Sequence, residues 1–498
     1  MGAQQERGRP GALELAVLAA ALALAAGLRL WQLGAASLWA DEIIMWSTAR
    51  RPLVDGLLQL QDYSAPLYQM LLRVVAPGER PPEWLLRLPA ALFGVLCVPA
   101  GWWLGRAFFG PAVGATLAVL LAANPALVAY ARMARPNSLF VLLSTVSVTF
   151  FWLLRTRGRA RHAAGWAAST LALLAAHYLG FLCLAAQAAW LAAEAAVLRS
   201  RFRLGRPTAA AAACVAAGAA PLALLAWRYV AAGAPATVGW IVPRGFGGLL
   251  GETGQLVGWS LPQPVARGTA AGAAFLVLAL AALWRASRPC EPEEAESAWR
   301  RHGAAALCAS WIAFGLLAFP LIELLYRPLL ATRYALQATV PLLAGALAFA
   351  GSLHRLALLA PAAAALALCI PSLPRALEPA PGLRELTAWL GRSAPRAAPI
   401  LVMDWAYAPG FVNPELVGLR YYGFDRPEVR LLELAYPDDI HIRNPEVLPE
   451  RGRAFIVGFV VPAQHVRREL VSKGWKVEVR PFGLEGVLVA RAPLRARP

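Results

Sequence analysis

Asp41 and Glu42 are adjacent carboxylates that closely follow the first long apolar run of the chain, in the segment Ser37–Glu42. Beside Trp39 at a membrane surface, such a pair is costly to desolvate without a purpose. One carboxylate could act as general base for an acceptor hydroxyl, with burial tuning its pKa. The alternative is structural: Ser37 or Asp41 caps a helix, and both acids complement its dipole. On residue types alone, the structural role is at least as well supported.

Three arginines flank other apolar runs on the same side as this acid pair. Arg132 and Arg135 follow the third run, and Arg333 precedes the tenth. Arginine offers a planar, bidentate donor that fits phosphate and carboxylate groups. Arg132 and Arg135 could hold a phosphate or pair with Asp41 or Glu42, and the alternative is simple contact with lipid head groups. Arg333 suits an anion at the membrane surface.

Three tyrosines and a histidine complete the set of candidate residues. Tyr68 follows the polar stretch Asp62–Pro66, which predicts a rigid turn into an interfacial helix. His177 and Tyr178 follow the fifth run, where a histidine is more often a satisfied interfacial residue than a catalyst. Tyr334 comes directly after the third arginine. An acid pair with several arginines on one face is what a transferase acting on a lipid phosphate requires.

The elements that must position these residues are membrane helices. Of the 498 residues, 59% are apolar and 15% are charged, and the mean hydropathy is +0.53. This composition excludes a soluble multidomain enzyme, a collagen and a disordered chain. The net charge of +18 comes mostly from arginines beside apolar runs, which favours a membrane surface over nucleic acid. The six cysteines show neither CxxC nor zinc-ligand spacing, so they imply neither disulfides nor a structural metal.

Eleven apolar runs predict membrane spans. The first is long for a signal peptide and lacks a small-residue cleavage site, so we expect it to be retained. Four arginines lie in each of the loops 155–161, 199–206 and 285–301, whereas the opposite loops are longer and poorer in arginine. The positive-inside rule puts the arginine-rich loops in the cytoplasm, and the odd span count then places the C-terminal region outside. The runs are residues 11–30, 85–104, 111–130, 138–154, 163–177, 179–198, 208–229, 269–284, 303–322, 334–350 and 356–372.

The predicted fold class is mainly α: a transmembrane helix bundle of about eleven spans, residues 1–371, with a small extracytoplasmic α/β domain, residues 372–498. External loops at residues 31–84 and 231–267 belong to the first part. In the tail, strand-like runs alternate with helical ones. The strand-like runs are residues 400–403, 429–434, 454–460, 476–479 and 486–490, the helical runs are 383–390 and 464–473, and two interfacial helices are expected in the first external loop, at 42–50 and 67–75.

Longer stretches around the candidate residues resemble the membrane glycosyltransferases of the GT-C class. The nearest likeness is to the dolichyl-phosphate-mannose protein mannosyltransferase family and its bacterial branch, which includes the aminoarabinose transferases of lipid A. It covers most of residues 12–350, and the Ser-Leu-Trp-x-Asp-Glu block is its most specific piece. Members take a sugar from a polyprenyl-phosphate donor and place it on an acceptor outside the cytoplasm. The stretches are residues 29–42, 64–73, 87–110, 124–143, 177–180 and 331–341.

Carried over residue by residue, the resemblance makes Asp41 the catalytic base and Glu42 its neighbour in the acid pair. Arg135 matches an arginine beyond the third span, and Arg333 matches one near the donor phosphate. Many bacterial relatives have His-Pro-Pro-Leu-Tyr where this chain has Ser-Ala-Pro-Leu-Tyr at residues 64–68, so any role of that histidine is absent here. The candidate substrate-binding residues are Arg135, Arg132, Tyr68, His177, Tyr178, Arg333 and Tyr334.

The resemblance implies an inverting displacement, with the polyprenyl chain between helices, its phosphate near the arginines and Asp41 taking the proton of the acceptor hydroxyl. The expected partners are a polyprenyl-phosphate-linked sugar, a lipid, glycan or protein acceptor, and the bilayer of a bacterial-type cytoplasmic membrane, but no nucleic acid. No cofactor is predicted, because an acid pair alone is a poor cage for a divalent metal.

Two other functions stay open. A transporter would place ionisable residues at mid-span and repeat broken helices in two halves, whereas here the charges cluster at the external ends and no such repeat is found. A polymerase or ligase that uses lipid-linked oligosaccharides would share the sidedness and the charges and differ in the size of its donor.

Overall fold

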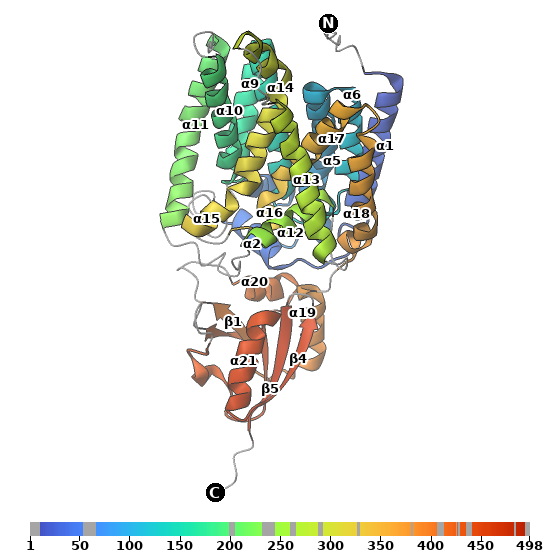
Figure 1. Ribbon diagram of the computed structural model, residues 1–498. Coiled ribbons are helices and arrows are strands. Elements are labelled where there is room, and N and C mark those ends of the chain that lie inside the picture. Colours follow the sequence, from blue (N-terminus) through green and yellow to red (C-terminus); the bar gives the residue numbers. More distant parts are fainter. Residues whose placement is uncertain are drawn as a thin grey trace.

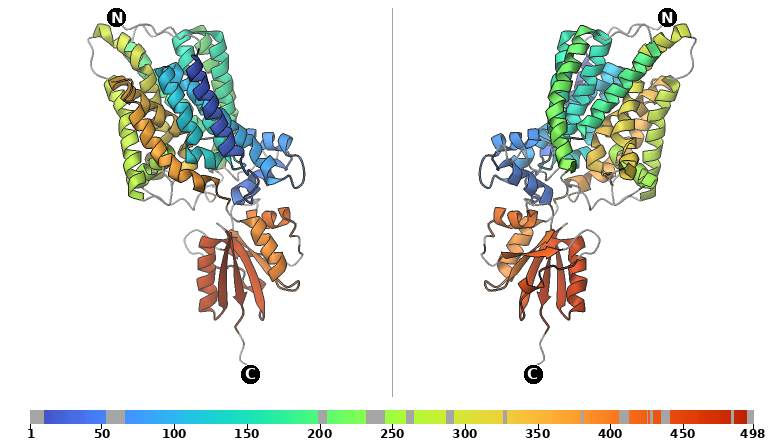
Figure 2. Two further views of the ribbon diagram at one scale, coloured as in Figure 1. Left: turned by 90° about the vertical axis from the view of Figure 1, so that its right-hand side faces the viewer. Right: turned by 90° about the vertical axis from the view of Figure 1, so that its left-hand side faces the viewer.

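A bundle of long helices forms one part of the molecule, and a five-stranded sheet with its own helices forms the other (Figure 1). The short helices α2 (Ala40–Ala49) and α12 (Gly245–Val257) lie at the end of the bundle that faces the sheet (Figures 1 and 2). The computed structural model describes residues 10–52, 66–198, 205–231, 245–258, 265–286, 292–325, 329–379, 382–405, 413–424, 426, 429–434, 441–482 and 485–493.

Nine helical segments in the described part of the chain are long and apolar enough to cross a membrane. The pair α6 (Pro111–Ala123) and α7 (Pro125–Ala131), bent by 57°, meets the same criterion when the two helices are taken together. The 17 residues of α9 (Ala160–Ala176) put it at the short end of the range for a span. All eleven predicted runs therefore fall on helices, and the predicted fold class is confirmed. The nine are α1 (Ala12–Leu30), α5 (Glu83–Phe109), α8 (Asn137–Arg157), α10 (Gly180–Leu198), α11 (Arg206–Ala231), α13 (Val265–Ala286), α14 (Pro292–Ile312) with η3 (Ala313–Leu317) and α15 (Phe319–Leu325), α16 (Thr332–Ala335) with η4 (Leu336–Ala338) and α17 (Thr339–Leu353), and α18 (Leu359–Leu377).

The break between α6 and α7 has a local cause in Asn124 and the proline that follows it. Proline lacks an N–H, so the carbonyls of the preceding turn lose their usual donor. Arg29, which is fully buried, donates to the carbonyls of Leu121 and Ala122, both at 3.0 Å. The Asn124 side chain accepts from the N–H of Leu127 at 3.0 Å and so caps α7. The bend directs the chain that follows α7 toward α2.

The first external loop has a core of its own, and the C-terminal tail takes part in it. Both predicted interfacial helices are present, as α2 and α4 (Pro66–Val75). Leu38, Ile43 and Tyr68 are fully buried there, and Leu383 and Tyr421 from the tail are buried in the same core. The tail is therefore packed onto the loop that carries the acid pair.

The tail contains a sheet in the order β2-β1-β3-β5-β4, in which β2, β1 and β3 are parallel and β5 pairs antiparallel with both β3 and β4. Side chains alternate along β1: Leu401 and Met403 pack toward α21, whereas Ile400 and Val402 pack toward α19 and α20. All five predicted strands and both predicted helices are present, and the unpredicted α20 begins at an Asn-Pro pair. The elements are β1 (Ile400–Trp405), β2 (Val429–Leu434), β3 (Arg453–Phe459), β4 (Lys476–Phe482), β5 (Glu485–Arg491), α19 (Leu383–Ser393), α20 (Pro414–Tyr421), α21 (Val460–Ser472) and η5 (Pro445–Val447).

One boundary differs from the expectation. The tail was predicted to begin at residue 372, but α18 continues to Leu377 through Pro371 and Pro374. Proline interrupts the ladder of helix hydrogen bonds without always ending the helix, since neighbouring groups can satisfy the freed carbonyls.

Candidate active site

Asp41 lies where three separate elements meet at the tail-facing end of the bundle. Its carboxylate Oδ2 is paired with Nη1 of Arg333, which belongs to α16. Nη2 of Arg135, from the turn after α7, lies 4.0 Å from the same oxygen, and Nη1 of Arg135 donates to the Asp41 carbonyl at 3.4 Å. The Asp41 side chain is 23% exposed, so solvent reaches it. We call these three residues the Asp41 cluster.

Glu42 lies in different surroundings, although it is the next residue. Its side chain is fully buried, and Arg87 of α5 binds both of its oxygens, from Nε at 2.8 Å and from Nη2 at 2.7 Å. The backbone N–H of Ala134 donates to Oε1 at 2.7 Å, and that of Trp39 donates to Oε2 at 3.3 Å. We call this group the Glu42 node. Four hydrogen bonds fill the acceptor positions of a carboxylate, so the geometry favours a structural role for Glu42 over the predicted catalytic one.

The capping alternative for Asp41 is not what the structure shows. The N-cap of α2 is Trp39, and no side chain caps it. Glu42 takes the structural position instead, by accepting from the Trp39 N–H. Asp41 is the second residue of the helix, and its side chain meets the two arginines.

Arg132, which was grouped with the substrate-binding residues, has a different set of partners. Its Nη1 donates to the carbonyls of Leu28 at 3.3 Å and Trp31 at 2.5 Å, and its Nη2 donates to that of Gln32 at 3.4 Å. These are the last carbonyls of α1 and those just beyond it, which lack partners within the helix. Arg132 therefore fastens the end of α1, and we do not include it in the Asp41 cluster.

The rings of His177 and Tyr334 pack behind Arg333. The Arg333 guanidinium lies 5.0 Å from the centre of the Tyr334 ring. The His177 ring meets Tyr334 edge to face at 6.2 Å and stacks on Phe140 at 4.6 Å. His177 is 2% exposed, and its Nδ1 accepts from the N–H of Leu179. These contacts hold the arginine in place rather than presenting the imidazole to a substrate.

Tyr68 and Tyr178, the other two tyrosines predicted to bind substrate, are also wholly or partly buried. Tyr68 is fully buried in the core of the first external loop, and burial raises the pKa of its hydroxyl. Burial raises the pKa of Tyr178 to about 12, so its hydroxyl stays protonated near neutral pH. Neither tyrosine has a described contact with Asp41, and their predicted role in substrate binding stays a prediction.

The sequence reasoning missed Arg87 and Glu252. Arg87 lies inside a predicted span, where a charge marks a special environment, and that signal was available. Glu252 is the one acid of α12 and is 2% exposed. It accepts a hydrogen bond from the Thr332 hydroxyl at 2.5 Å, next to Arg333.

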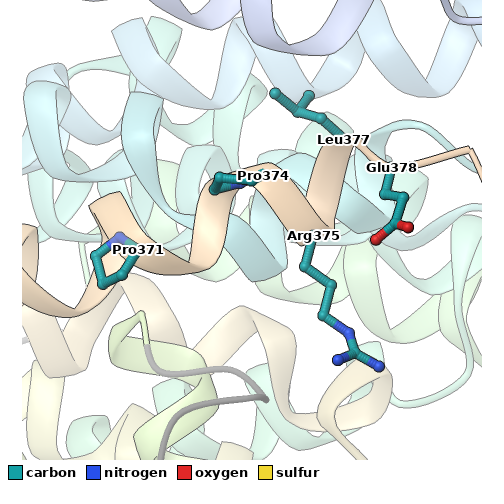
Figure 3. A pocket seen from close by; sticks show the side chains of 5 residues that line it. All are labelled: Pro371, Pro374, Arg375, Leu377 and Glu378. Carbon is teal, nitrogen blue, oxygen red and sulfur yellow. The ribbon is translucent and has the colours of Figure 1, made fainter.

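A hollow of about 620 Å³ lies at the C-terminal end of α18 (Figure 3). Arg375 and Glu378 extend from the same side of the helix in that figure. Among the described side chains, the residues that line the hollow make no contact with the Asp41 cluster, so it is not part of this site. No group of three or more metal-binding side chains is found in the described ranges. The hollow is lined by Pro371, Pro374, Arg375, Leu377 and Glu378.

Comparison with known proteins identifies the fold. Residues 52–186 match the family model of the dolichyl-phosphate-mannose-protein mannosyltransferases. ArnT from Cupriavidus metallidurans, in the apo state, is 15% identical and superposes with a TM-score of 0.54 over 97% of this chain and 98% of its own. AglB, the oligosaccharyltransferase of Archaeoglobus fulgidus, solved with an inhibitory peptide and a dolichol-phosphate, is 12% identical, with a TM-score of 0.54 over 96% and 74%. The chain has the GT-C fold.

The predicted resemblance is confirmed, and the chain is a multi-pass membrane protein with the fold of membrane glycosyltransferases. The family model supports glycosyl transfer as the class of reaction. It spans Tyr68, Arg132, Arg135, His177 and Tyr178 but neither acid of α2. No curated protein matches the sequence. The roles of the individual site residues therefore rest on the geometry and on the resemblance of motifs.

Proposed function

We propose that this protein transfers a sugar from a polyprenyl-phosphate donor to an acceptor hydroxyl at the outer face of a bacterial-type cytoplasmic membrane, with inversion at the anomeric carbon. The observation that carries the proposal is the Asp41 cluster, in which one partly exposed carboxylate is shared by two arginines. The acceptor is a lipid, a glycan or a protein.

The charges of the cluster suit an anionic donor. Asp41 contributes one negative charge, and Arg135 and Arg333 contribute two positive ones, so the cluster keeps a surplus of one positive charge. A phosphate that approaches from outside meets guanidinium groups already fixed by packing, which lowers the cost of reorganisation at the moment of reaction. The Tyr334 ring under Arg333 restricts the guanidinium further.

Donor binding also prepares the base. Arg333 is paired with Oδ2 of Asp41, and a donor phosphate competes for the same guanidinium. As the phosphate takes over Arg333, Oδ2 is released toward the acceptor hydroxyl. Oδ2 then accepts the hydroxyl proton while the hydroxyl oxygen bonds to the anomeric carbon, and the bond from that carbon to the phosphate oxygen breaks. The polyprenyl phosphate leaves with its electron pair held by the arginines.

The comparisons support the donor class from two sides. The matching family model is named for dolichyl-phosphate-mannose, and AglB was solved with a dolichol-phosphate. A transporter is less well supported, because the described ionisable cluster lies at the tail-facing end of the bundle and not at mid-span (Figure 1). We assign the helical bundle, through the end of α18 at Leu377, to the transmembrane domain and the residues that follow to a tail domain on the outer face.

The proposal is tested by mass spectrometry of glycolipids and glycoproteins from cells that carry the wild-type protein, no protein, or the variant Asp41→Asn. We expect one sugar modification that is present only with the wild type. Membranes are then supplied with a radiolabelled polyprenyl-phosphate sugar or with the corresponding nucleotide sugar, and only the lipid-linked donor should label the product directly. Identical glycan profiles in all three strains, or transfer of a pre-assembled oligosaccharide, would exclude the proposal.

The sidedness of the tail is tested separately. A C-terminal fusion to alkaline phosphatase should be active, and a fusion to a fluorescent protein that matures only in the cytoplasm should be dark. The opposite pattern would place the tail, and with it the Asp41 cluster, on the cytoplasmic side.

A further inference from the structure

Residues 33–39, which lead into the first residue of α2, form neither helix nor strand, so their backbone polar groups need partners from elsewhere in the fold. Arg87 of α5 supplies donors on the bundle side. It donates to the carbonyls of Leu33 at 3.1 Å, Ala36 at 2.8 Å and Ser37 at 2.9 Å. The same guanidinium binds Glu42, so one buried arginine holds both the lead-in segment (residues 33–40) and the first turn of α2.

Three side chains of the tail bind the lead-in segment from the other side. They are Arg384, whose Nη2 donates to the carbonyl of Ala35, Tyr422, whose hydroxyl accepts from the N–H of Leu38 at 2.7 Å, and Glu485, whose carboxylate accepts from the N–H of Ala40. The lead-in segment is thus held between the bundle and the tail, and its contacts with the tail continue up to Leu38 and Ala40, three residues and one residue before Asp41.

Tyr422 uses its hydroxyl twice. Besides accepting from Leu38, it donates to Oε1 of Glu83, the first residue of α5, at 3.3 Å. Arg384 donates to the same oxygen at 3.0 Å. Burial raises the pKa of Tyr422, which keeps the hydroxyl protonated and able to do both. One phenol therefore ties the entry of α2 to the start of α5.

We propose that Tyr422 is a positioning residue for Asp41, and that the tail domain fixes the catalytic carboxylate by holding the lead-in segment. This inference rests on the proposed function. A general base must lie within hydrogen-bonding distance of the hydroxyl that it deprotonates, and a misplacement of about 1 Å can cost two orders of magnitude in rate. Loss of the Leu38 contact releases the N–H just before the turn that carries Asp41.

Tyr421 provides a matched control. Its hydroxyl donates to the carbonyl of Pro81 and makes no described contact with the lead-in segment. Its ring packs edge to face on Trp46 at 4.9 Å, a contact that phenylalanine retains. The substitutions Tyr421→Phe and Tyr422→Phe therefore remove the same atom from adjacent residues, and only the second one touches the segment that leads to Asp41.

The experiment uses the full-length protein with each substitution. Three quantities are compared: amide hydrogen exchange of residues 35–45, the amount of the sugar product that depends on Asp41, and binding of undecaprenyl phosphate. For Tyr422→Phe we expect faster exchange in this peptide, product formation lower by roughly tenfold as for the loss of one or two hydrogen bonds, and lipid binding within about twofold of wild type. Tyr421→Phe should match the wild type in all three.

A cycle with Asp41→Asn separates positioning from general damage. If Tyr422 acts through Asp41, Tyr422→Phe should lower the residual product of Asp41→Asn little or not at all. Equal effects of the two phenylalanine variants, unchanged exchange in Tyr422→Phe, or an undiminished loss in the Asp41→Asn background would each overturn the inference. Should Tyr422→Phe not fold, Arg384→Met removes the contacts with Ala35 and Glu83 from a side chain that is 38% exposed, and the same outcomes apply.

Failure of the proposed function looks different. In that case no product depends on Asp41 in the first place, and the positioning role falls with it. A product that requires Asp41 but is indifferent to Tyr422 and Arg384 leaves the proposed function in place and removes only the role of the tail.

Discussion

The Asp41 cluster and the Glu42 node begin at neighbouring residues of one short helix, yet they use their charges differently. Every acceptor position of Glu42 is filled by Arg87 and two backbone N–H groups, and the side chain has no exposed surface. Asp41 is 23% exposed and shares one oxygen between two arginines. Consecutive residues of a helix point about 100° apart, so one acid faces the interior and the other faces the open end of the bundle.

The difference shows how the two adjacent carboxylates take different roles, one structural and one available for catalysis. A buried charge is tolerable only when it is fully paired and hydrogen-bonded, and a fully paired carboxylate cannot accept a proton from a substrate. A partly exposed carboxylate can exchange one partner for another at lower cost. Two acids that look alike in the sequence are thus assigned to unlike tasks by the face of α2 that each occupies.

The largest expected effect is on catalysis at Asp41. Asp41→Asn keeps the shape of the side chain and removes its ability to accept a proton, so product formation should fall by about 10²–10⁴-fold. Folding and undecaprenyl phosphate binding should survive, as judged by size-exclusion chromatography and lipid binding. Near-normal turnover of the folded variant would end the assignment of Asp41 as base.

The next effect is on stability at Glu42. Glu42→Ala leaves Arg87 buried without its counter-charge, which should cost about 3–5 kcal/mol of unfolding free energy. Asp41→Ala removes a carboxylate that solvent already reaches, so its cost should be clearly smaller than that of Glu42→Ala. Thermal unfolding of both variants in the same detergent provides the measurement, and equal losses of stability would erase the distinction between the two groups.

Arg333 tests whether the Asp41 cluster receives the donor phosphate. Arg333→Ala should weaken undecaprenyl phosphate binding by roughly tenfold to a hundredfold, as for the loss of a charged hydrogen bond of about 1.5–3 kcal/mol. Arg333→Lys should restore part of the binding, because lysine keeps the charge but lacks the bidentate fork. Arg375→Ala, which removes an arginine outside the cluster, is the control. Equal binding by the Arg333→Ala, Arg375→Ala and wild-type proteins would remove the phosphate-binding role.

A buried acid of the tail, Glu415, extends the comparison to pH. It is fully buried in the tail, and neither of its oxygens has a hydrogen-bond partner among the described residues. Burial, with the nearby charges of Glu485 and Asp404, raises the pKa of Glu415 to about 8. Between the usual pKa of a glutamate, about 4.3, and this value, the folded state holds a proton that the unfolded state has lost.

The stability of the tail should therefore fall as pH rises from 5 to 8, by at most about 1.4 kcal/mol per pH unit for this group. Glu415→Gln should flatten the dependence, with its largest gain in melting temperature at pH 8 and little change at pH 5. A steeper fall for Glu415→Gln than for the wild type would contradict the raised pKa.

Much of the fold followed from the sequence. Apolar runs of membrane length predicted the helices, because a backbone in lipid must satisfy its own hydrogen bonds. Strand-like runs such as residues 429–434 predicted β2 with the bounds that the structure has, because one face of a sheet must be buried against helices. The last helix of the bundle ends later than the predicted residue 372, because α18 continues through two prolines to Leu377.

The residues that make up the site also followed from the sequence, but the ion pairs and hydrogen bonds among them did not. Types and sidedness of residues pointed to Asp41, Arg135 and Arg333, and the structure brings these three together. The sequence did not show that Arg87, 45 residues from Glu42, neutralises that acid, or that Arg132 turns back to the end of α1.

What the sequence by itself determined is therefore periodicity, sidedness and the chemical types that gather at one end of the bundle. These are properties of local stretches, because each helix partitions between water and lipid according to its own residues. The tertiary structure decided which charge meets which. Arg333 reaches Asp41 across 292 residues, and Tyr422 reaches Leu38 across 384. Such contacts depend on the angle of each helix and the face that each residue occupies, and these are fixed only when all the helices and the tail pack together.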